Sequence, residues 1–266
     1  MSLQPDTSES APQPGCHLDR VRYAELSSVR SLFPKGATVL EVGGGNGYQA
    51  AVLTSWGFQV ISIDIDTQGA WTQRYFDVVG YDGKVIPVES GKVDVVFSSN
   101  VLEHIPQADL MLLFAEMRRV LAPGGFLIHI LPSPVWRFWT MMAHYPWLIA
   151  RLVRGSKTEA GIALPTLAAT MSRRGWLGLV KRAFWPAPHG EYPSSVAELF
   201  AFRENAWRKR FEAGGLEVVR CCPTGIFYTG YTLLSRLPMS WRFCLARLLG
   251  SACKIYVVKQ VSPCSA

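Results

Sequence analysis

The chain has 266 residues, a formal net charge of +7, 49% hydrophobic residues and 18% charged residues. This balance provides for a substantial buried core and excludes a chain that is disordered throughout. No run of about twenty uncharged apolar residues occurs, which argues against a membrane-spanning segment. The length fits one large α/β domain with insertions or two small domains.

Six cysteines are scattered along the chain, and none of them forms a Cys-x-x-Cys pair. The neighbours Cys221 and Cys222 cannot readily bridge each other, so we expect reduced thiols in a cytoplasmic protein. The chain has only five histidines to complement the cysteines. The sequence therefore predicts no metal site.

The beginning of the chain, residues 1–17, is polar and contains prolines. It lacks the basic region followed by an apolar stretch that marks a signal peptide, and we expect a disordered tail.

Beyond this tail, apolar runs of strand length alternate with helical patterns. This alternation predicts a parallel, doubly wound sheet. The expected strands of the first half cover residues 37–42, 59–63, 93–98 and 126–131, and the expected helices cover 18–33, 48–56 and 110–121.

The alternation stops after Pro132 and resumes near residue 194. We interpret residues 135–193 as an insertion or cap that binds the acceptor substrate. A helix over 194–213, a strand over 216–221, a helix over 239–249 and a strand over 254–259 are expected to follow.

Basic residues are concentrated in this insertion. Residues 135–190 contain eight lysines and arginines against the single acid Glu159, and 8 − 1 equals the whole excess of +7. Farther along, Trp176, Leu179, Val180 and Ala183 fall on one helical face, opposite the basic residues Arg174, Lys181 and Arg182. This pattern is typical both of a helix that lies on a membrane surface and of an ordinary cap packed on a core.

A glycine-rich turn, Gly43-Gly44-Gly45-Asn46-Gly47, joins the first expected strand to a helix. Glycines let the backbone approach a ligand closely, and the helix N-terminus offers unpaired N–H groups to carboxylate or phosphate oxygens. The spacing is G-x-G-x-G, because Tyr48 stands where the last glycine of a dinucleotide-binding G-x-G-x-x-G would be. A tight turn without a ligand is the alternative.

Two further segments are predicted to meet this turn. Asp64 ends the second strand, twenty-three residues after Glu41 (64 − 41), where a carboxylate can accept both ribose hydroxyls of an adenosine. Residues 98–100 follow another strand. Ligands of open α/β sheets bind at the carboxyl ends of the strands, so we expect these segments to surround one crevice.

Four segments resemble, in order and spacing, the signature blocks of class I S-adenosylmethionine (SAM)-dependent methyltransferases of the small-molecule type. They are VLEVGGGNGYQA, VISIDID, VDVVFSSNVLEHI and EMRRVLAPGGFLIHILPSP, within residues 38–134. The resemblance implies a Rossmann-like α/β fold with a doubly wound, mostly parallel sheet, an antiparallel last strand and a helical insertion. The SAM-binding domain would comprise residues 18–134 and 194–262.

The resemblance also implies roles for single residues. Gly43, Gly45 and Gly47 would face the methionine moiety of SAM, with Asn46 in the same turn. Glu41 would approach the SAM amino group directly or through water.

At the adenosine end, Asp64 would hold the ribose hydroxyls and Ile65 would pack on the adenine. Asp82, next to Gly83, stands where an acidic residue of such proteins often binds the adenine amine. Asn100 and the backbone near Ser98 would line the methyl-transfer face.

Three titratable residues are candidates for a catalytic role. His104 ends a Leu-Glu-His block, for which a structural role at a helix start is the alternative. His189 and Glu191 lie in a loop bounded by glycine and prolines, which is either a set of acceptor contacts or an exposed loop. His129, inside a strand, is expected to be a core histidine.

The sequence thus favours an enzyme that transfers a methyl group from SAM to a small-molecule acceptor. An apolar or lipid-linked acceptor is favoured by the aromatic insertion, which is also a candidate membrane contact, so the protein is expected in the cytoplasm or at the inner membrane surface. Nucleic acid is disfavoured as a partner because no recognisable RNA-binding pattern occurs. The alternatives are a non-catalytic SAM-fold scaffold and a nicotinamide-dependent oxidoreductase, which Tyr48 disfavours.

Overall fold

A computed structural model describes residues 11–67, 69, 73–154, 186–231 and 234–261. Its centre is one seven-stranded sheet with the strand order β3-β2-β1-β4-β5-β7-β6. The strands are β1 (Thr38–Val42), β2 (Gln59–Asp64), β3 (Val79–Gly80), β4 (Val93–Ser99), β5 (Leu121–Pro132), β6 (Leu216–Pro223) and β7 (Cys253–Gln260).

The first five strands run parallel, and β7 is antiparallel to both of its neighbours, β5 and β6. The predicted mostly parallel sheet with an antiparallel last strand is therefore confirmed. β1 and β4 are buried along almost their whole length, as expected for parallel strands that helices cover on both faces.

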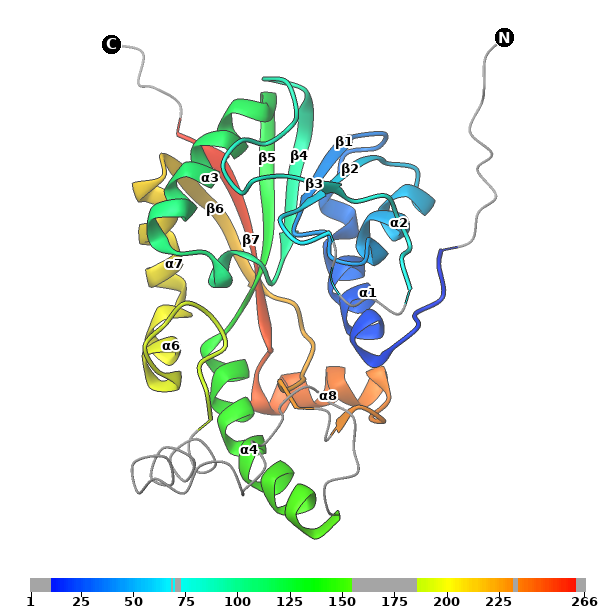
Figure 1. The fold of residues 1–266 in the computed structure, drawn as a ribbon, viewed down its shortest axis with the longest axis vertical. Helices are drawn as coiled ribbons and strands as arrows, with labels where there is room; N and C mark the ends of the chain where they lie inside the picture. The colour runs from blue at the N-terminus through cyan, green and yellow to red at the C-terminus, as the bar shows by residue number, and fades with distance from the viewer. Residues whose placement is uncertain (1–10, 68, 70–72, 155–185, 232–233, 262–266) are drawn as a thin grey trace, which may run out of the picture.

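Helices pack on both faces of this sheet (Figure 1). One apolar core lies between the sheet and helices α1 and α2, and a second lies between the sheet and helices α3 and α7. The helices are α1 (His17–Val29), α2 (Tyr48–Ser55), α3 (Gln107–Val120), α4 (Pro134–Arg154), α6 (Ser195–Ala201), α7 (Glu204–Ala213) and α8 (Met239–Leu249), with short 3₁₀ helices η1 (Arg30–Leu32) and η2 (Leu102–His104).

Two elements differ from the sequence expectation. The single helix expected over 194–213 is divided into α6 and α7, because Arg203 takes an extended conformation between them. This break lets α6 pack on α4 while α7 buries Trp207 and Phe211 beside the sheet. The strand expected from residue 126 already begins at Leu121, through the Pro-Gly-Gly segment.

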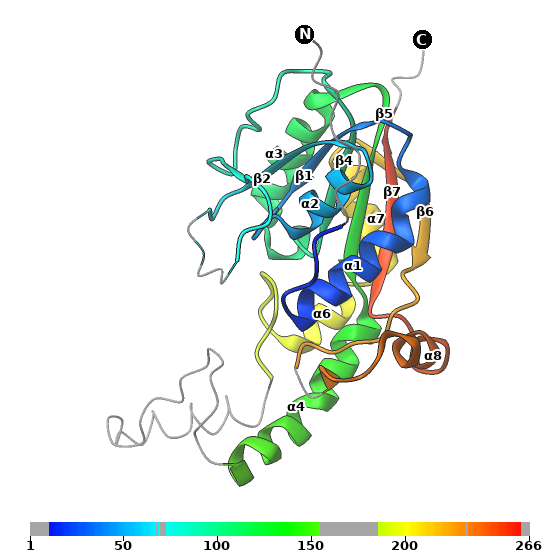
Figure 2. The same cartoon turned by 90° about the vertical axis from the view of Figure 1, so that its right-hand side faces the viewer.

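The insertion expected over 135–193 begins with α4, a helix of 21 residues that contains Pro146. In both ribbon views α4 extends beyond the carboxyl edge of the sheet (Figures 1 and 2). The amphipathic pattern of Trp176, Arg174, Lys181 and Arg182 lies outside the described residues. Within the described residues, no helix is both long enough and apolar enough to span a bilayer.

Residues 11–16, which the sequence groups with the tail, lie against the body of the domain. The Tyr48 hydroxyl donates to the Pro12 carbonyl at 3.3 Å, and the Gly15 N–H donates to the Tyr75 hydroxyl at 3.0 Å. Cys16 and Asp19 cap the N-terminus of α1.

Candidate functional site

The glycine-rich turn between β1 and α2 has a backbone that favours glycine. Gly43, Gly45 and Gly47 have φ values of 80°, 55° and 78°, in the left-handed region that side chains with a Cβ rarely adopt. At Gly44 the obstacle is space, because a Cβ would lie 2.0 Å from the Ser62 hydroxyl oxygen. The turn therefore brings bare backbone to the carboxyl edge of the sheet.

Asp64 lies directly beside this turn, because β2 is the parallel neighbour of β1. Its Oδ2 accepts the Gly45 N–H at 2.8 Å and its Oδ1 accepts the Asp66 N–H at 3.0 Å. A carboxylate oxygen can accept a further hydrogen bond, so Asp64 retains acceptor capacity for a ligand hydroxyl. The structure thus joins the two motifs that the sequence placed at one crevice.

An apolar surface adjoins this carboxylate. The Ile65 side chain is 71% exposed, and a Cβ on Gly83 would be 3.4 Å from its Cγ2. Asp82 closes the turn before Gly83 by accepting two backbone N–H groups, and these bonds lower the pKa of its carboxyl. Asp64, Ile65, Asp82 and Gly83 therefore lie along one edge of the candidate site.

Glu41 lies beneath the turn rather than on its surface. Its carboxylate is buried and accepts the Ser62 hydroxyl at 2.5 Å. Burial raises the pKa of Glu41 to about 7. The negative charge of Asp64 also raises this pKa, whereas the hydrogen bond from Ser62 lowers it.

Three other predicted residues have distinct places. The Asn46 side chain accepts the Tyr48 N–H at 3.1 Å and so helps to begin α2. Asn100, with φ of 55°, turns the chain just after β4. The Ser98 hydroxyl is buried and bonds to His129 Nδ1 at 2.8 Å, so its side chain serves the interior of the sheet.

The prediction of His129 as a core histidine is confirmed. Its ring is fully buried and stacks on Phe211, with ring centroids 5.5 Å apart. Burial lowers its pKa to about 3, which keeps the imidazole neutral.

His104 and His189 come together although they are far apart in sequence. Their ring centroids are 4.6 Å apart, and Trp136 of α4 packs on the other side of His189 at 4.7 Å. Glu191 is tied to the same place, because its N–H donates to the Glu103 carbonyl at 3.3 Å. All three catalytic candidates thus lie around η2, just beyond β4.

A buried ion pair holds the loop that carries His189. Arg137 of α4 lies 2.8 Å from a carboxylate oxygen of Glu198 on α6, and both side chains are almost completely buried. The other Glu198 oxygen accepts the N–H groups of His189 and Gly190 at 2.5 and 2.6 Å. Arg137 also donates to the Ala187 carbonyl at 2.6 Å.

Sequence reasoning missed a buried polar network under α1. Glu25 forms an ion pair with Arg22 at 2.6 Å and accepts the Tyr228 hydroxyl at 2.8 Å. That hydroxyl lies 3.0 Å from the Cys253 sulfur, which in turn contacts Asn100 at 3.5 Å. The available signal was an acidic residue on the apolar face of a predicted helix.

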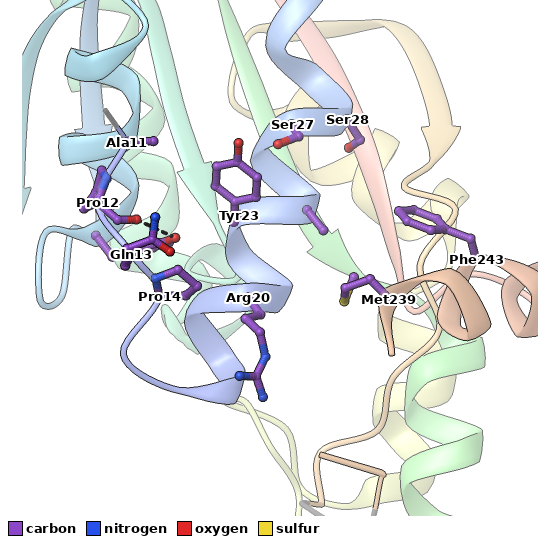
Figure 3. A pocket seen from close by; sticks show the side chains of 12 residues that line it. Ala11, Pro12, Gln13, Pro14, Arg20, Tyr23, Ser27, Ser28, Met239 and Phe243 are labelled. Carbon is purple, nitrogen blue, oxygen red and sulfur yellow. Dashed lines mark hydrogen bonds between the residues drawn. The ribbon is translucent and has the colours of Figure 1, made fainter. Parts of the chain in front are cut away.

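A cavity of about 700 Å³ lies on the outer side of α1 (Figure 3). Residues 11–14 border it on one side, and Met239 and Phe243 of α8 border it on the other. Of its lining residues, Tyr48 alone adjoins the glycine-rich turn. We therefore locate the candidate site at the carboxyl edge of the sheet and not in this cavity.

Comparisons with known proteins agree with this geometry. Residues 40–129 match the family model described as a methyltransferase domain. An uncharacterized methyltransferase of Mycobacterium sp. (strain KMS) is 40% identical over 107 residues, which are 39% of this chain and 41% of that protein. An uncharacterized methyltransferase of Mycobacterium tuberculosis is 37% identical over 109 residues, again 39% and 41% of the two chains.

Residues 40–129 of this chain are thus similar to a methyltransferase domain. The matched residues include the glycine-rich turn, Asp64 and the strands β2 and β4. The fold also resembles the crystal structure of a SAM-dependent methyltransferase from Aquifex aeolicus, with a TM-score of 0.50, 16% identity, and coverage of 92% of this chain and 95% of that one. The sequence match to the mycobacterial relatives spans about two fifths of their length.

Proposed function

We propose that the methyltransferase domain transfers the methyl group of SAM to a small-molecule acceptor that is apolar or lipid-linked. The observation that carries this proposal is the contact between the glycine-rich turn and Asp64, at 2.8 Å. This contact brings three groups together: the glycine backbone with positive φ, the N-terminus of α2, and the Asp64 carboxylate, which can accept a further hydrogen bond.

The residues present suit SAM in charge and polarity. SAM has a cationic sulfonium and ammonium, and the acids Glu41, Asp64 and Asp82 lie on this side of the sheet. The exposed Ile65 offers apolar surface for the adenine, beside the carboxylate that would hold the ribose. When bound, SAM supplies an electrophilic methyl group, so the protein must mainly align the acceptor and exclude water.

His104 and His189 are proposed to serve the acceptor. Burial lowers the pKa of both imidazoles, that of His189 to about 4, which favours the neutral form of each ring. A neutral imidazole nitrogen can accept a proton from an acceptor hydroxyl. Glu191 lies near enough to His104 to favour the protonated ring that would result.

The surface of α4 supports an apolar acceptor. Four large side chains at helical spacing form an exposed row, which we call the α4 stripe, and its members are Phe138, Met142, Tyr145 and Ile149. Trp136 lies on the buried side of the same helix, where it packs on His189. An amphipathic surface beside a basic segment is suited to a lipid interface.

Calorimetry with SAM and with NADH tests the proposed cofactor. We expect SAM to bind, and we expect Asp64→Asn to weaken its affinity at least tenfold because the ribose hydroxyls lose a charged acceptor. Asp109→Asn, on the exposed first turn of α3, is the matched control and should bind SAM normally. Tight NADH binding without SAM binding would contradict the proposal.

Isotope-labelled SAM tests the transfer itself. Incubation of the protein with lipid and polar extracts should label products in the lipid fraction. SAM binding without any labelled product would favour the non-catalytic scaffold instead. Label found only in polar products would contradict the proposal of an apolar acceptor but would support methyl transfer.

A further inference from the structure

Glu103, in η2, is a buried acid whose carboxylate accepts no hydrogen bond from any other residue that the structure describes. Its side chain is fully buried, and neither carboxylate oxygen has a hydrogen-bond partner among the described residues. A buried carboxylate normally has charged or hydrogen-bonding partners, because desolvation without them costs several kcal/mol. The buried Glu103 carboxylate therefore needs a bound proton, a hydrogen-bond donor or a nearby cation to be stable.

Two imidazoles stand beside this carboxylate. One ligand atom from each of Glu103, His104 and His189 can be chosen so that all three lie within 4.8 Å of one another. The Nε2 atom of His104 is 3.9 Å from Glu103 Oε1, too far for a hydrogen bond. Both histidines are partly exposed, so the cluster can be reached from solvent.

The neighbouring cations are already neutralised. Arg22 and Arg137 are the basic groups whose charges act on this cluster. Arg22 forms its ion pair with Glu25 at 2.6 Å, and Arg137 forms its own with Glu198 at 2.8 Å. Within the described part of the chain, the Glu103 carboxylate is therefore left without an ion pair to a lysine or arginine.

We propose that Glu103, His104 and His189 together bind one divalent first-row transition-metal ion, with zinc as the reference case. Ligands at about 2.1 Å from a tetrahedral zinc ion lie about 3.4 Å from one another, so the three groups need to approach by about 1 Å. Rotation of the partly exposed His104 and His189 side chains can supply this shift.

The ligand types select the class of metal. Two imidazole nitrogens and one carboxylate suit zinc, iron, cobalt or nickel, whereas magnesium and calcium prefer oxygen ligands alone. Three protein ligands leave a coordination position for water or for a substrate oxygen. An imidazole that binds a metal has no free lone pair, so with the metal bound this site replaces the proton-accepting role proposed for His104 and His189. The proposed SAM binding does not depend on it.

Titration of the full-length chain tests the site without SAM. The protein is treated with EDTA, dialysed, and titrated with Zn²⁺ by calorimetry and with Co²⁺ by visible absorption. We expect one ion per chain, no comparable binding of Mg²⁺, and at least a tenfold loss of Zn²⁺ affinity in each of Glu103→Gln, His104→Gln and His189→Gln. The control is His17→Gln, at the start of α1, which should keep the original affinity.

Circular dichroism of each variant separates loss of ligand from loss of fold. The partly exposed His104 and His189 can be replaced without disturbing a core, so these two variants decide the matter if Glu103→Gln does not fold. Zinc bound by cysteines would persist in both histidine variants, and that result would overturn the proposal. Absence of Zn²⁺ and Co²⁺ binding by the unmodified chain would overturn it equally.

Discussion

Glu103 illustrates how burial makes one carboxyl group sensitive to pH. Burial raises its pKa from 4.5 to about 8, so near pH 6 the folded protein keeps a proton that the unfolded chain has released. The free energy of unfolding must then fall as the pH rises from about 4.5 to about 8. Below this range the group is protonated in both states and has no effect.

The variant Glu103→Gln should remove this loss of stability. In EDTA, we expect it to unfold like the unmodified protein at pH 5 and to be more stable at pH 8.5, on the order of 5 kcal/mol, since each pKa unit is worth about 1.4 kcal/mol. Urea unfolding at the two pH values measures the difference. An unchanged difference between pH 5 and pH 8.5 would mean that Glu103 ionises normally.

Gly44 links the stability of the turn to cofactor binding. A Cβ at this position would meet the Ser62 hydroxyl oxygen at 2.0 Å and Glu41 Oε2 at 3.1 Å. We expect Gly44→Ala to lower the free energy of unfolding by about 1–3 kcal/mol, as overpacking does, and to weaken SAM binding by displacing the turn.

The control for this variant is Gly124→Ala. Gly124 has a positive φ but open space around its Cβ position, so this change should reduce stability without altering SAM affinity. Calorimetry with SAM and thermal unfolding of both variants provide the comparison. Normal SAM affinity in Gly44→Ala would show that the turn tolerates a side chain.

At the scale of elements, the junction of α4 and α6 depends on the Arg137–Glu198 ion pair. Loss of one partner from a buried pair leaves an uncompensated charge and costs about 3–5 kcal/mol. We expect Arg137→Met to destabilise the protein by this amount at pH 8. At pH 5 the effect should be smaller, because burial already raises the pKa of Glu198 and a protonated carboxyl needs no cation.

A surface pair supplies the matched control. Lys92 and Glu89 are 3.5 Å apart and both are largely exposed, so Lys92→Met should change stability by less than about 1 kcal/mol. Denaturant unfolding of both variants at pH 5 and pH 8 measures the contrast. Equal effects of the two substitutions would show that the α4–α6 junction does not rely on its ion pair.

At the scale of the whole molecule, α4 extends beyond the carboxyl edge of the sheet (Figure 2). The four side chains of the α4 stripe are exposed on this helix. We expect the protein to float with vesicles that contain anionic phospholipid, and the double variant Phe138→Ser, Ile149→Ser to lose at least about tenfold in vesicle affinity. Full burial of one such side chain contributes about 1.5–3 kcal/mol to binding. Partial burial of two such side chains is therefore enough to account for the expected loss of vesicle affinity.

The control removes exposed apolar side chains elsewhere. Leu112 on α3 and Val219 on β6 are about half exposed, and their replacement by serine should leave flotation unchanged. SAM affinity should be the same in both double variants, since neither touches the glycine-rich turn. If the unmodified protein does not float, the stripe is not a membrane contact.

The contact between the glycine-rich turn and Asp64 was largely predictable, and the reason is local. Parallel strands bring their carboxyl ends to one edge, so the turn after β1 and Asp64 after β2 had to meet once both strands were recognised. The same argument placed Asn100 after β4. The sequence did not predict that Glu41 is buried or that the Ser98 hydroxyl bonds to His129. Both features depend on how neighbouring strands pack, because packing decides which side chains face each other.

The sequence alone determined the alternation of strands and helices, the glycine-rich turn and its carboxylate partner, since each depends on short-range pattern. Only the tertiary structure brought His189 to His104. It also revealed that the buried Glu103 carboxylate accepts no hydrogen bond from another described residue. The contact between the two histidines rests on an ion pair between α4 and α6 and on two backbone hydrogen bonds to Glu198. Contacts of this kind join segments far apart in the chain, and no local spacing encodes them.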